Sequence, residues 1–469
     1  MAPALPLHWT WYVLPRAGDS AGNTLQLLRG GDELFPAMRA AIEAAEHEVW
    51  LATYIFHTDA TALALLGCLS AAARRGVAVH IVIDGFGSLH SAAALAPLCE
   101  AAGIRLAVFR PLRRLAHWLN PGQLRRLHMK LCAVDGRIGF AGGINLIDDH
   151  IDLRHGRSEA PRLDYAARVE GPAAQAIAQA TRAIWSRAAF GRSWRAEARR
   201  LLARAWRDDL MRRHGQFTPP GAAPPPLPAR SRLAWLKAQL RLWQAARGGQ
   251  GAGQPGRSAL AEPATPAHDG LSAGATVARL VVRDNLRQRR AIEQSYITAL
   301  ASARERVLLV CPYFYPGGEF RRALIDAARR GVRVSLLLQG KVDYRLAALA
   351  AQALYDELLG AGVAIHEYTP AFLHAKVAVV DQHWATVGSS NIDPLSLLLN
   401  LEANLVVRDP QFCAALASAI ELDLAQARPV SGADPLQQGW RGWPGLVRRA
   451  LVAWVAHVYL RVAGVTGRY

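Results

Sequence analysis

The sequence predicts an α/β protein in which two similar halves pair as a pseudo-dimer within one chain. The first observation is a repeated polar motif: residues 128–145 read HMKLCAVDGRIGFAGGIN and residues 374–391 read HAKVAVVDQHWATVGSSN. Both follow the pattern H-x-K-x4-D-x6-G-x-x-N. The second observation is that neighbouring segments repeat as well, because residues 71–83 match residues 326–338. A repeat of this length indicates a duplicated domain.

Each half alternates helices with apolar strands. Residues 71–83 and 326–338 both read as a helix end, a glycine and a buried strand. The other elements expected, in chain order, are a helix at 31–46 with Asp32 as a possible N-cap, a strand at 48–56, a helix-to-strand transition at 102–109, a helix at 286–303, a strand at 306–314 and a second transition at 361–368. This alternation predicts a sheet covered on both faces, so each half is expected to be an α/β/α sandwich.

Changes in composition mark the expected boundaries. These are an N-terminal segment 1–22, a first half 23–190, a linker 191–275, a second half 276–430 and a C-terminal segment 436–469. The linker is Arg-rich at first and then rich in Pro, Gly and Ser, so we expect it to be disordered. The C-terminal segment contains WPGLVRRALVAWVAHVYLR at 443–461, which has the pattern of an amphipathic helix.

Charge and cysteine content narrow the classes of partner. The net charge of +18 predicts an anionic partner: nucleic acid, an anionic membrane surface or a phosphate-bearing substrate. The five cysteines are scattered and odd in number, which is typical of a reducing compartment rather than a disulfide framework. We expect no secretory signal, and no apolar run reaches the roughly 18 residues of a membrane span.

The repeated motif carries groups that suit a phosphodiester. Residues i and i+2 of a strand share a face, so His128 and Lys130 should project together, as should His374 and Lys376. Only four of the 55 basic residues are Lys, yet both motifs keep one. Lys and the motif amides, Asn145 and Asn391, would neutralise phosphate oxygens in the transition state.

Two histidines at one phosphate allow one to attack phosphorus and the other to protonate the leaving alkoxide. No cluster of residues has convincing metal-ligand spacing, so this scheme uses no metal and no cofactor. Taken alone, either His is more readily explained as a hydrogen-bonded core residue, and it is the duplicated set that favours the catalytic interpretation. Asp135 and Asp381 complete the motif as candidate catalytic residues, although their place at a turn favours a structural role.

These residues resemble the signature of the phospholipase D superfamily, H-x-K-x4-D-x6-G-S-x-N in two copies. The second copy is intact and contains Ser389, whereas the first has Gly143 in place of the serine. The stretches GRIGFAGGINLIDDH, PRLDYAARVEGPA, YTPAFLHAKVAVVD and WATVGSSNIDPLSLLLNLEANLVV resemble bacterial cardiolipin synthases, and most of all those of the B type. The resemblance covers residues 23–190 and 276–420.

The resemblance implies a ping-pong reaction in which a histidine carries a phosphatidyl group from phosphatidylglycerol to a second phosphatidylglycerol, with release of glycerol. It implies that His128 is the nucleophile and His374 the general acid, and that Asp164 and Glu402 orient the histidines. Ser389 joins the two Asn residues as a phosphate-binding group. It also implies a monomeric pseudo-dimer, bound peripherally to the cytoplasmic face of the cell inner membrane, with anionic phospholipid as its partner.

Two segments are candidates for contact with lipid. Residues 101–134 contain no acidic residue and interleave Arg with Leu and Trp, and the C-terminal helix combines Trp, Tyr and Arg around a short apolar run. The alternatives are a solvated Arg-rich loop and a helix packed on the core. For the whole chain the alternatives are a nuclease or other phosphodiesterase of the same superfamily, and a non-catalytic scaffold. We expect no nucleic acid partner, because the basic segments are rich in Leu and Trp.

Overall fold

The computed structural model describes residues 14–15, 17–111, 125–153, 155–190, 276–284, 288–341, 351–393, 396 and 400–431. The linker 191–275, the C-terminal segment 436–469 and most of the N-terminal segment 1–22 lie outside the described residues. The same holds for residues 112–124 of the basic segment 101–134.

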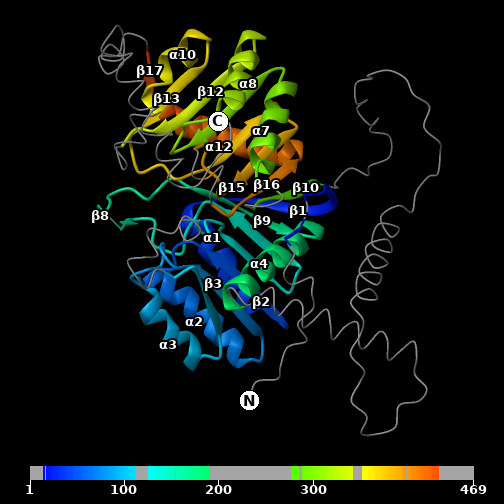
Figure 1. The fold of residues 1–469 in the computed structure, drawn as a ribbon, viewed down its shortest axis with the longest axis vertical. Helices are drawn as coiled ribbons and strands as arrows, with labels where there is room; N and C mark the ends of the chain where they lie inside the picture. The colour runs from blue at the N-terminus through cyan, green and yellow to red at the C-terminus, as the bar shows by residue number, and fades with distance from the viewer. Residues whose placement is uncertain are drawn as a thin grey trace, which may run out of the picture. The chain divides into compact units, whose positions relative to one another are not determined.

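The two halves repeat one order of elements (Figure 1). The first half contains β1 (Ser20–Arg29), α1 (Gly30–Glu43), β2 (Glu48–Thr53), α2 (Ala60–Arg74), β3 (Ala78–Asp84), α3 (Ala92–Ala101), β4 (Arg105–Phe109), β5 (Leu131–Val134), β6 (Ile138–Gly142), β7 (Ile151–Asp152), β8 (Gly156–Arg157), β9 (Tyr165–Glu170) and α4 (Pro172–Phe190). The second half contains β10 (Thr276–Arg283), α7 (Ala291–Ser302), β11 (Arg306–Cys311), α8 (Gly318–Arg329), β12 (Arg333–Gln339), α10 (Tyr355–Gly360), β13 (Ala364–Tyr368), β14 (Val377–Val380), β15 (Trp384–Gly388), β16 (Glu402–Arg408), α12 (Pro410–Ala425) and β17 (Arg428–Val430).

One mixed sheet runs through both halves. Among the described residues its order is β17-β13-β12-β11-β14-β15-β16-β10-β1-β9-β6-β5-β2-β3-β4. Read outward from the centre, β10-β16-β15-β14-β11-β12-β13 repeats β1-β9-β6-β5-β2-β3-β4. The halves join where β1 pairs with β10 in antiparallel fashion (Figure 1). The prediction of a duplicated α/β fold is confirmed.

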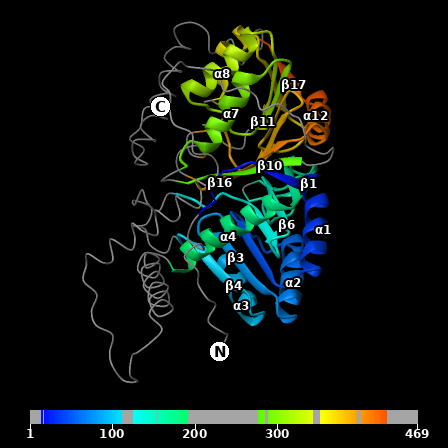
Figure 2. The same cartoon turned by 90° about the vertical axis from the view of Figure 1, so that its right-hand side faces the viewer.

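Alternation along the strands gives the sheet two buried faces. In β5, Leu131 and Ala133 belong to one apolar cluster, and Cys132 and Val134 belong to another. The first cluster includes α4 and α12 and spans both halves. The other faces are covered separately, by α1, α2 and α3 in the first half and by α7, α8 and α10 in the second (Figure 2). The sheet therefore lies between two layers of helices. One of its faces packs on an apolar core common to both halves, and the other face packs on a separate core in each half.

A polar contact adds to the apolar contact between the halves. Asp423 of α12 is fully buried, and its carboxylate accepts a hydrogen bond of 2.5 Å from the hydroxyl of Tyr165 in β9. The same carboxylate pairs with Arg29, at the end of β1. Since an unpaired buried carboxylate is costly, this contact fixes α12 against the strands of the other half.

Two local predictions need correction. Asp32 is not the N-cap of the first helix, because α1 begins at Gly30 with Arg29 as its N-cap and Asp32 lies in the first turn. Each H-x-K segment was expected inside a strand, but it lies just before one, since β5 begins at Leu131 and β14 at Val377. Within the described ranges, no helix combines the length and apolar character that a membrane span requires.

Candidate active site

The two H-x-K segments are held by backbone pairing with the opposite half. The N–H of His128 donates to the carbonyl of Leu401 at 3.0 Å, and the N–H of His374 donates to the carbonyl of Leu163 at 2.8 Å. Leu401 and Leu163 each precede the acidic residue predicted to orient a histidine. The pairing therefore brings each histidine next to an acid that belongs to the other half of the chain.

A polar side chain at the end of a neighbouring strand fixes the start of each segment. Asp84, the last residue of β3, accepts a 2.8 Å hydrogen bond from the N–H of Leu127. Gln339, the last residue of β12, accepts one of 2.9 Å from the N–H of Leu373. Our sequence analysis missed both residues. The available signal was a polar residue at the same place in two matching apolar strands.

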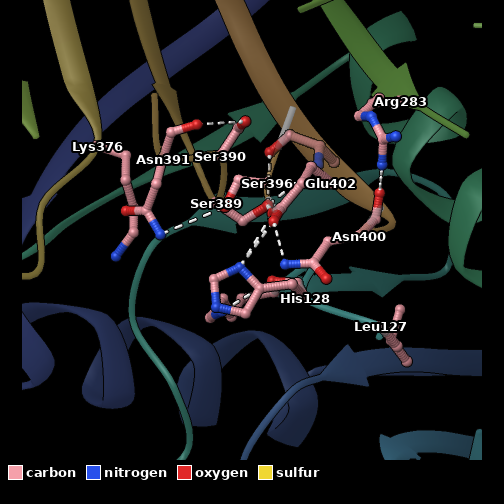
Figure 3. A network of polar contacts seen from close by, with 12 residues as sticks. Leu127, His128, Arg283, Lys376, Ser389, Ser390, Asn391, Ser396, Asn400 and Glu402 are labelled. Carbon is pink, nitrogen blue, oxygen red and sulfur yellow. Dashed lines mark hydrogen bonds and ion pairs between the residues drawn. The ribbon is translucent and has the colours of Figure 1, made fainter. Parts of the chain in front are cut away.

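The two histidine–acid pairs are crossed between the halves. Nδ1 of His128 lies 3.0 Å from the carboxylate of Glu402, the first residue of β16 (Figure 3). Nδ1 of His374 lies 2.6 Å from Oδ2 of Asp164, which directly precedes β9. Because Nδ1 faces the carboxylate in each pair, Nε2 is the ring nitrogen left to meet a substrate.

The lysines lie beside the histidines, as the alternation of side chains predicts. Met129 and Ala375, the residues between them, are fully buried in the apolar core. The ammonium of Lys130 donates to the carbonyl of His128 at 2.7 Å, and that of Lys376 donates to the carbonyl of His374. The histidine and lysine side chains thus project to one side of each segment, and the intervening Met129 and Ala375 anchor the segment in the core.

Burial shifts the protonation of both lysines. Desolvation, followed by repulsion from the Lys376 charge, lowers the pKa of Lys130 to about 7. Desolvation also lowers the pKa of Lys376 to about 8, although the nearby carboxylate of Asp164 opposes it. Each ammonium would be stabilised by an anion, so binding of a phosphodiester favours the charged form of both.

The two acids differ in their electrostatics. Burial raises the pKa of Asp164 to about 7, and the charge of Lys376 only partly offsets it. Burial also acts on Glu402, but the charge of His128 and its hydrogen bond outweigh it and lower the pKa. Glu402 therefore remains ionised at neutral pH, whereas the pair of Asp164 with His374 retains a proton more readily.

The imidazoles are both weakly basic and mostly shielded from solvent, with 12% of the His128 side chain and 19% of the His374 side chain exposed. Burial lowers the pKa of His128, against the opposing charge of Glu402. Burial and then the charge of Lys376 hold the pKa of His374 well below its usual value. A neutral imidazole is the form that attacks phosphorus, and an adjacent anionic substrate would raise the pKa of either ring.

The residues predicted to bind phosphate have unequal surroundings. The hydroxyl of Ser389 donates to Glu402 at 2.5 Å, so it is engaged with the acid rather than directed at a phosphate. Asn391 is buried and donates to Ser396 at 3.4 Å. Asn145 is also buried, and its Oδ1 accepts from the N–H of Ile55 at 3.2 Å, which leaves its amide hydrogens facing elsewhere.

The two motif aspartates lie at the far ends of the strands from the lysines. Asp135 accepts hydrogen bonds of 2.8–2.9 Å from the N–H groups of Glu46, His47 and Glu48. Asp381 makes the matching bonds of 2.9–3.0 Å with Arg304, Glu305 and Arg306. Both residues have φ near +50°, as residues of a tight turn do. This geometry favours turn architecture over a catalytic role.

An aromatic ring also borders the site. Tyr54 contacts His128 edge-to-face, with ring centroids 4.9 Å apart, and the ammonium of Lys130 lies 5.4 Å from the centroid of Tyr54. Our sequence analysis missed Tyr54.

In the part of the chain that the structure describes, no group of three or more His, Cys, Asp or Glu residues is placed to hold a metal ion.

Comparisons with known proteins agree with this geometry. The family model "Cardiolipin synthase, PLD-like domain" matches residues 38–156 and 296–424. Cardiolipin synthase B of Escherichia coli (strain K12) is 34% identical over 393 residues, which cover 83% of this chain and 78% of that protein. Cardiolipin synthase A of Cronobacter sakazakii is 28% identical over 409 residues, covering 87% and 70%. The resemblance seen in the two motifs is confirmed.

A solved structure supports the fold independently. The crystal structure of phosphatidylserine synthase from Haemophilus influenzae Rd KW20 superposes with a TM-score of 0.58, covering 93% of this chain and 94% of that one. At 12% identity, this likeness concerns the fold alone.

The geometry of Asp135 leads to a prediction about stability. Asp135→Ala should lower the free energy of unfolding by about 2 kcal/mol, because three backbone N–H groups lose their acceptor at the protein surface. Asp135→Asn should retain most of that stability, since Asn keeps an acceptor oxygen and tolerates the positive φ. Urea denaturation measures both, and the activity per folded molecule should stay within about twofold of wild type.

The pH dependence of this effect has a defined sign. Burial acts to raise the pKa of Asp135, but its three backbone hydrogen bonds outweigh burial and hold the pKa below the ordinary value of an aspartate, about 3.9. The stabilisation is therefore complete above that value and is lost as the pH falls through the lower folded-state pKa. If Asp135→Ala abolished activity without changing stability, a catalytic role would replace the structural one.

Proposed function

Because the chain belongs to the cardiolipin synthase family of phospholipase D-like enzymes, we propose that it transfers a phosphatidyl group from one phosphatidylglycerol to another and releases glycerol. The observation that carries the proposal is the pair of complete, crossed histidine–acid pairs. Each half of the chain supplies one histidine, one lysine and the acid of the other pair. A chain that had lost its activity and served as a scaffold would have no need for this set.

The first half-reaction begins with His128. Its neutral Nε2 attacks the phosphorus of the donor lipid, the bond from phosphorus to the glycerol oxygen breaks, and the pair of His374 and Asp164 gives the leaving oxygen its proton. The phosphorylated imidazole carries positive charge, so it benefits from a partner that stays ionised. Glu402, with its lowered pKa, meets that requirement better than Asp164 does.

The second half-reaction reverses these roles. A hydroxyl of the second phosphatidylglycerol attacks the phosphohistidine, its proton passes to His374, and the bond from phosphorus to nitrogen breaks. Lys130 and Lys376 stabilise the charge on the phosphate oxygens in both transition states, with Asn145 and Asn391 as further donors. Asp164 orients His374 throughout, as the carboxylate of a catalytic triad orients its imidazole.

Lipid products test this proposal directly. Purified full-length protein is incubated with phosphatidylglycerol vesicles, and the extracted lipid and the released glycerol are measured. Cardiolipin and glycerol in equal amounts support the proposal. Phosphatidic acid as the sole lipid product would indicate a hydrolase instead, and absence of any product from intact lipid would overturn the proposed activity.

We also propose that the enzyme binds peripherally to the cytoplasmic face of the cell inner membrane, as a monomer, with anionic lipid as its partner. The sequence supports this with the basic, aromatic pattern of residues 101–134 and 443–461. The site itself supports it because both lysines are stabilised by an anionic headgroup.

Removal of residues 436–469 should weaken membrane association without unfolding the protein. The segment places Trp443, Trp454 and Tyr459 around an apolar run too short to span a bilayer. Sedimentation with anionic vesicles at low and high salt measures the effect, and neutral vesicles serve as the control. Unchanged pelleting of the truncated chain would contradict the prediction, and insoluble protein would show that the segment completes the core.

The roles of the two histidines lead to a leaving-group prediction. His374→Ala should slow the release of glycerol at least about a hundredfold, but should slow the release of an activated aryl alcohol far less, because a good leaving group needs little protonation. His128→Ala should abolish turnover of both donors, since no nucleophile remains. Trapping of phosphohistidine at 374 in the wild-type enzyme, and none at 128, would reverse the assignment.

A further inference from the structure

The surroundings of the two acids differ at each of three equivalent positions. Glu402 is bordered by Ser389, Asn400 and Arg283 (Figure 3). Around Asp164, the backbone pairing places Gly143 where Ser389 lies in the other half, Arg162 where Asn400 lies, and Gly30 where Arg283 lies. The frame is symmetric, but in the hydrogen bonds that the structure gives, the side-chain donors other than the histidines lie on the Glu402 side.

The first difference is a hydroxyl. Ser389 donates to Oε2 of Glu402 at 2.5 Å and is itself held by the N–H of Ala403, which donates to the hydroxyl oxygen at 3.1 Å. Gly143 stands at the matching position and packs so closely on Asp164 that any Cβ there would collide with the carboxylate. A serine therefore cannot be accommodated on that side without movement of Asp164.

The second difference is an amide. Nδ2 of Asn400 donates to Oε1 of Glu402 at 3.3 Å, so both carboxylate oxygens have a donor besides His128. Arg162 occupies the equivalent place before Asp164, but its guanidinium donates to the carbonyl of Ile151 at 2.6 Å. The amide of Asn400 thus has no side-chain counterpart on Asp164 among the hydrogen bonds that the structure gives. Besides His374, the donor to Asp164 is the backbone N–H of Tyr165, which lies 2.8 Å from Oδ1.

The third difference is a buried cation. Arg283 is fully buried, lies across from Glu402 in the pairing of β10 with β16, and donates to the backbone carbonyl of Asn400 (Figure 3). Its Nε donates to the carbonyl of Arg289 at 3.2 Å. Gly30 faces Asp164 in the other half, and the half-buried carboxyl of Asp149 lies close to Gly30 and to the N–H of Gly31. Lys130 and Lys376 act on both acids. The difference is that Glu402 has the additional buried cation Arg283 nearby, whereas Asp164 has the additional carboxyl group of Asp149.

We infer that Ser389, Asn400 and Arg283 are positioning residues that keep Glu402 ionised and directed at Nδ1 of His128, and so make the His128 side of the site the one that carries the covalent intermediate. This inference rests on the proposed two-histidine transfer. The side with Gly143 and Gly30 lacks these three side chains, and its acid, Asp164, shares a proton with His374 more readily. The two half-sites therefore have different roles although the backbone around them is duplicated: the His128 side carries the covalent intermediate, and the His374 side transfers the proton.

Charged groups around Glu402 set the direction of the expected change. Those facing it are His128, Lys130, Lys376 and Arg283, in addition to the two neutral donors. Loss of a neutral donor leaves these charges in place and removes one hydrogen bond to the anion. The pKa of Glu402 then rises, so the acid limb of the covalent step moves to higher pH.

The test uses a phosphatidyl ester of 4-nitrophenol in phospholipid vesicles, in a single turnover of the full-length enzyme. Release of 4-nitrophenol then reports formation of phosphohistidine without the need for a general acid. Asn400→Ala and Ser389→Gly should each slow this step about tenfold at neutral pH and move its acid limb up by about one pH unit, as expected for loss of a hydrogen bond to a charged group. Arg162→Ala, at the position equivalent to Asn400, should leave the acid limb in place.

Several outcomes separate the inference from the proposed function. An unchanged acid limb in both folded variants, while the wild-type enzyme makes cardiolipin, would overturn the inference and leave the function standing. A shifted limb in an enzyme that makes no cardiolipin would support the inference and overturn the function. If Asn400→Ala does not fold, Ser389→Gly decides alone, because it reproduces the residue found at 143. A lower melting temperature with no shift of the limb would indicate a structural role only, and would count against the inference.

Discussion

Each histidine of this site pairs with an acid from the other half of the chain, and the rest of the fold holds the two halves so that these pairs can form. The N–H of His128 is held by Leu401 and the N–H of His374 by Leu163, so the two pairs form only when the halves are docked in one register. The β1–β10 pairing sets that register, and the buried contact of Asp423 with Tyr165 and Arg29 secures it. Neither half alone contains a complete histidine–acid pair.

Burial explains why this arrangement is suited to an anionic ligand. Two ammonium groups and two acids lie in a low-dielectric interior, where each charge depends on its partners. Desolvation brings the pKa of both lysines close to physiological pH, so a bound phosphate would increase the protonated fraction of each. A phosphodiester that enters the site strengthens the charge of the lysines and the basicity of the imidazoles together. Substrate binding and activation of the site are thus parts of one electrostatic change.

Much of this could be predicted from sequence, because spacing reports on local geometry. The i, i+2 relation of His and Lys and the burial of Met129 and Ala375 follow from the alternation of an extended chain. The crossing of the pairs did not follow, since it depends on long-range pairing between Leu401 and residues 126–128. The structural placement of Asp135 was favoured by its turn, whereas the engagement of Ser389 with Glu402 was not anticipated from the motif. Asp84 and Gln339 end matching strands of the repeat, a signal that becomes visible only when the two halves are aligned, whereas nothing in the local sequence of Tyr54 marks it as a neighbour of the site.

A duplicated frame would, by symmetry, give two equivalent histidines, yet a ping-pong transfer needs one to hold the covalent group and the other to move the proton. We infer that the difference arises from side chains around the acids rather than from the histidines themselves. Ser389, Asn400 and Arg283 stabilise an anion next to His128, while Gly143 and Gly30 leave Asp164 beside another carboxyl group. A phosphoryl-imidazole intermediate carries positive charge and gains from the permanent anion, whereas a group that both donates and recovers a proton gains from a partner that titrates near neutrality. Because the second half-reaction retraces the first with a new alcohol, the same division of roles serves both directions of transfer.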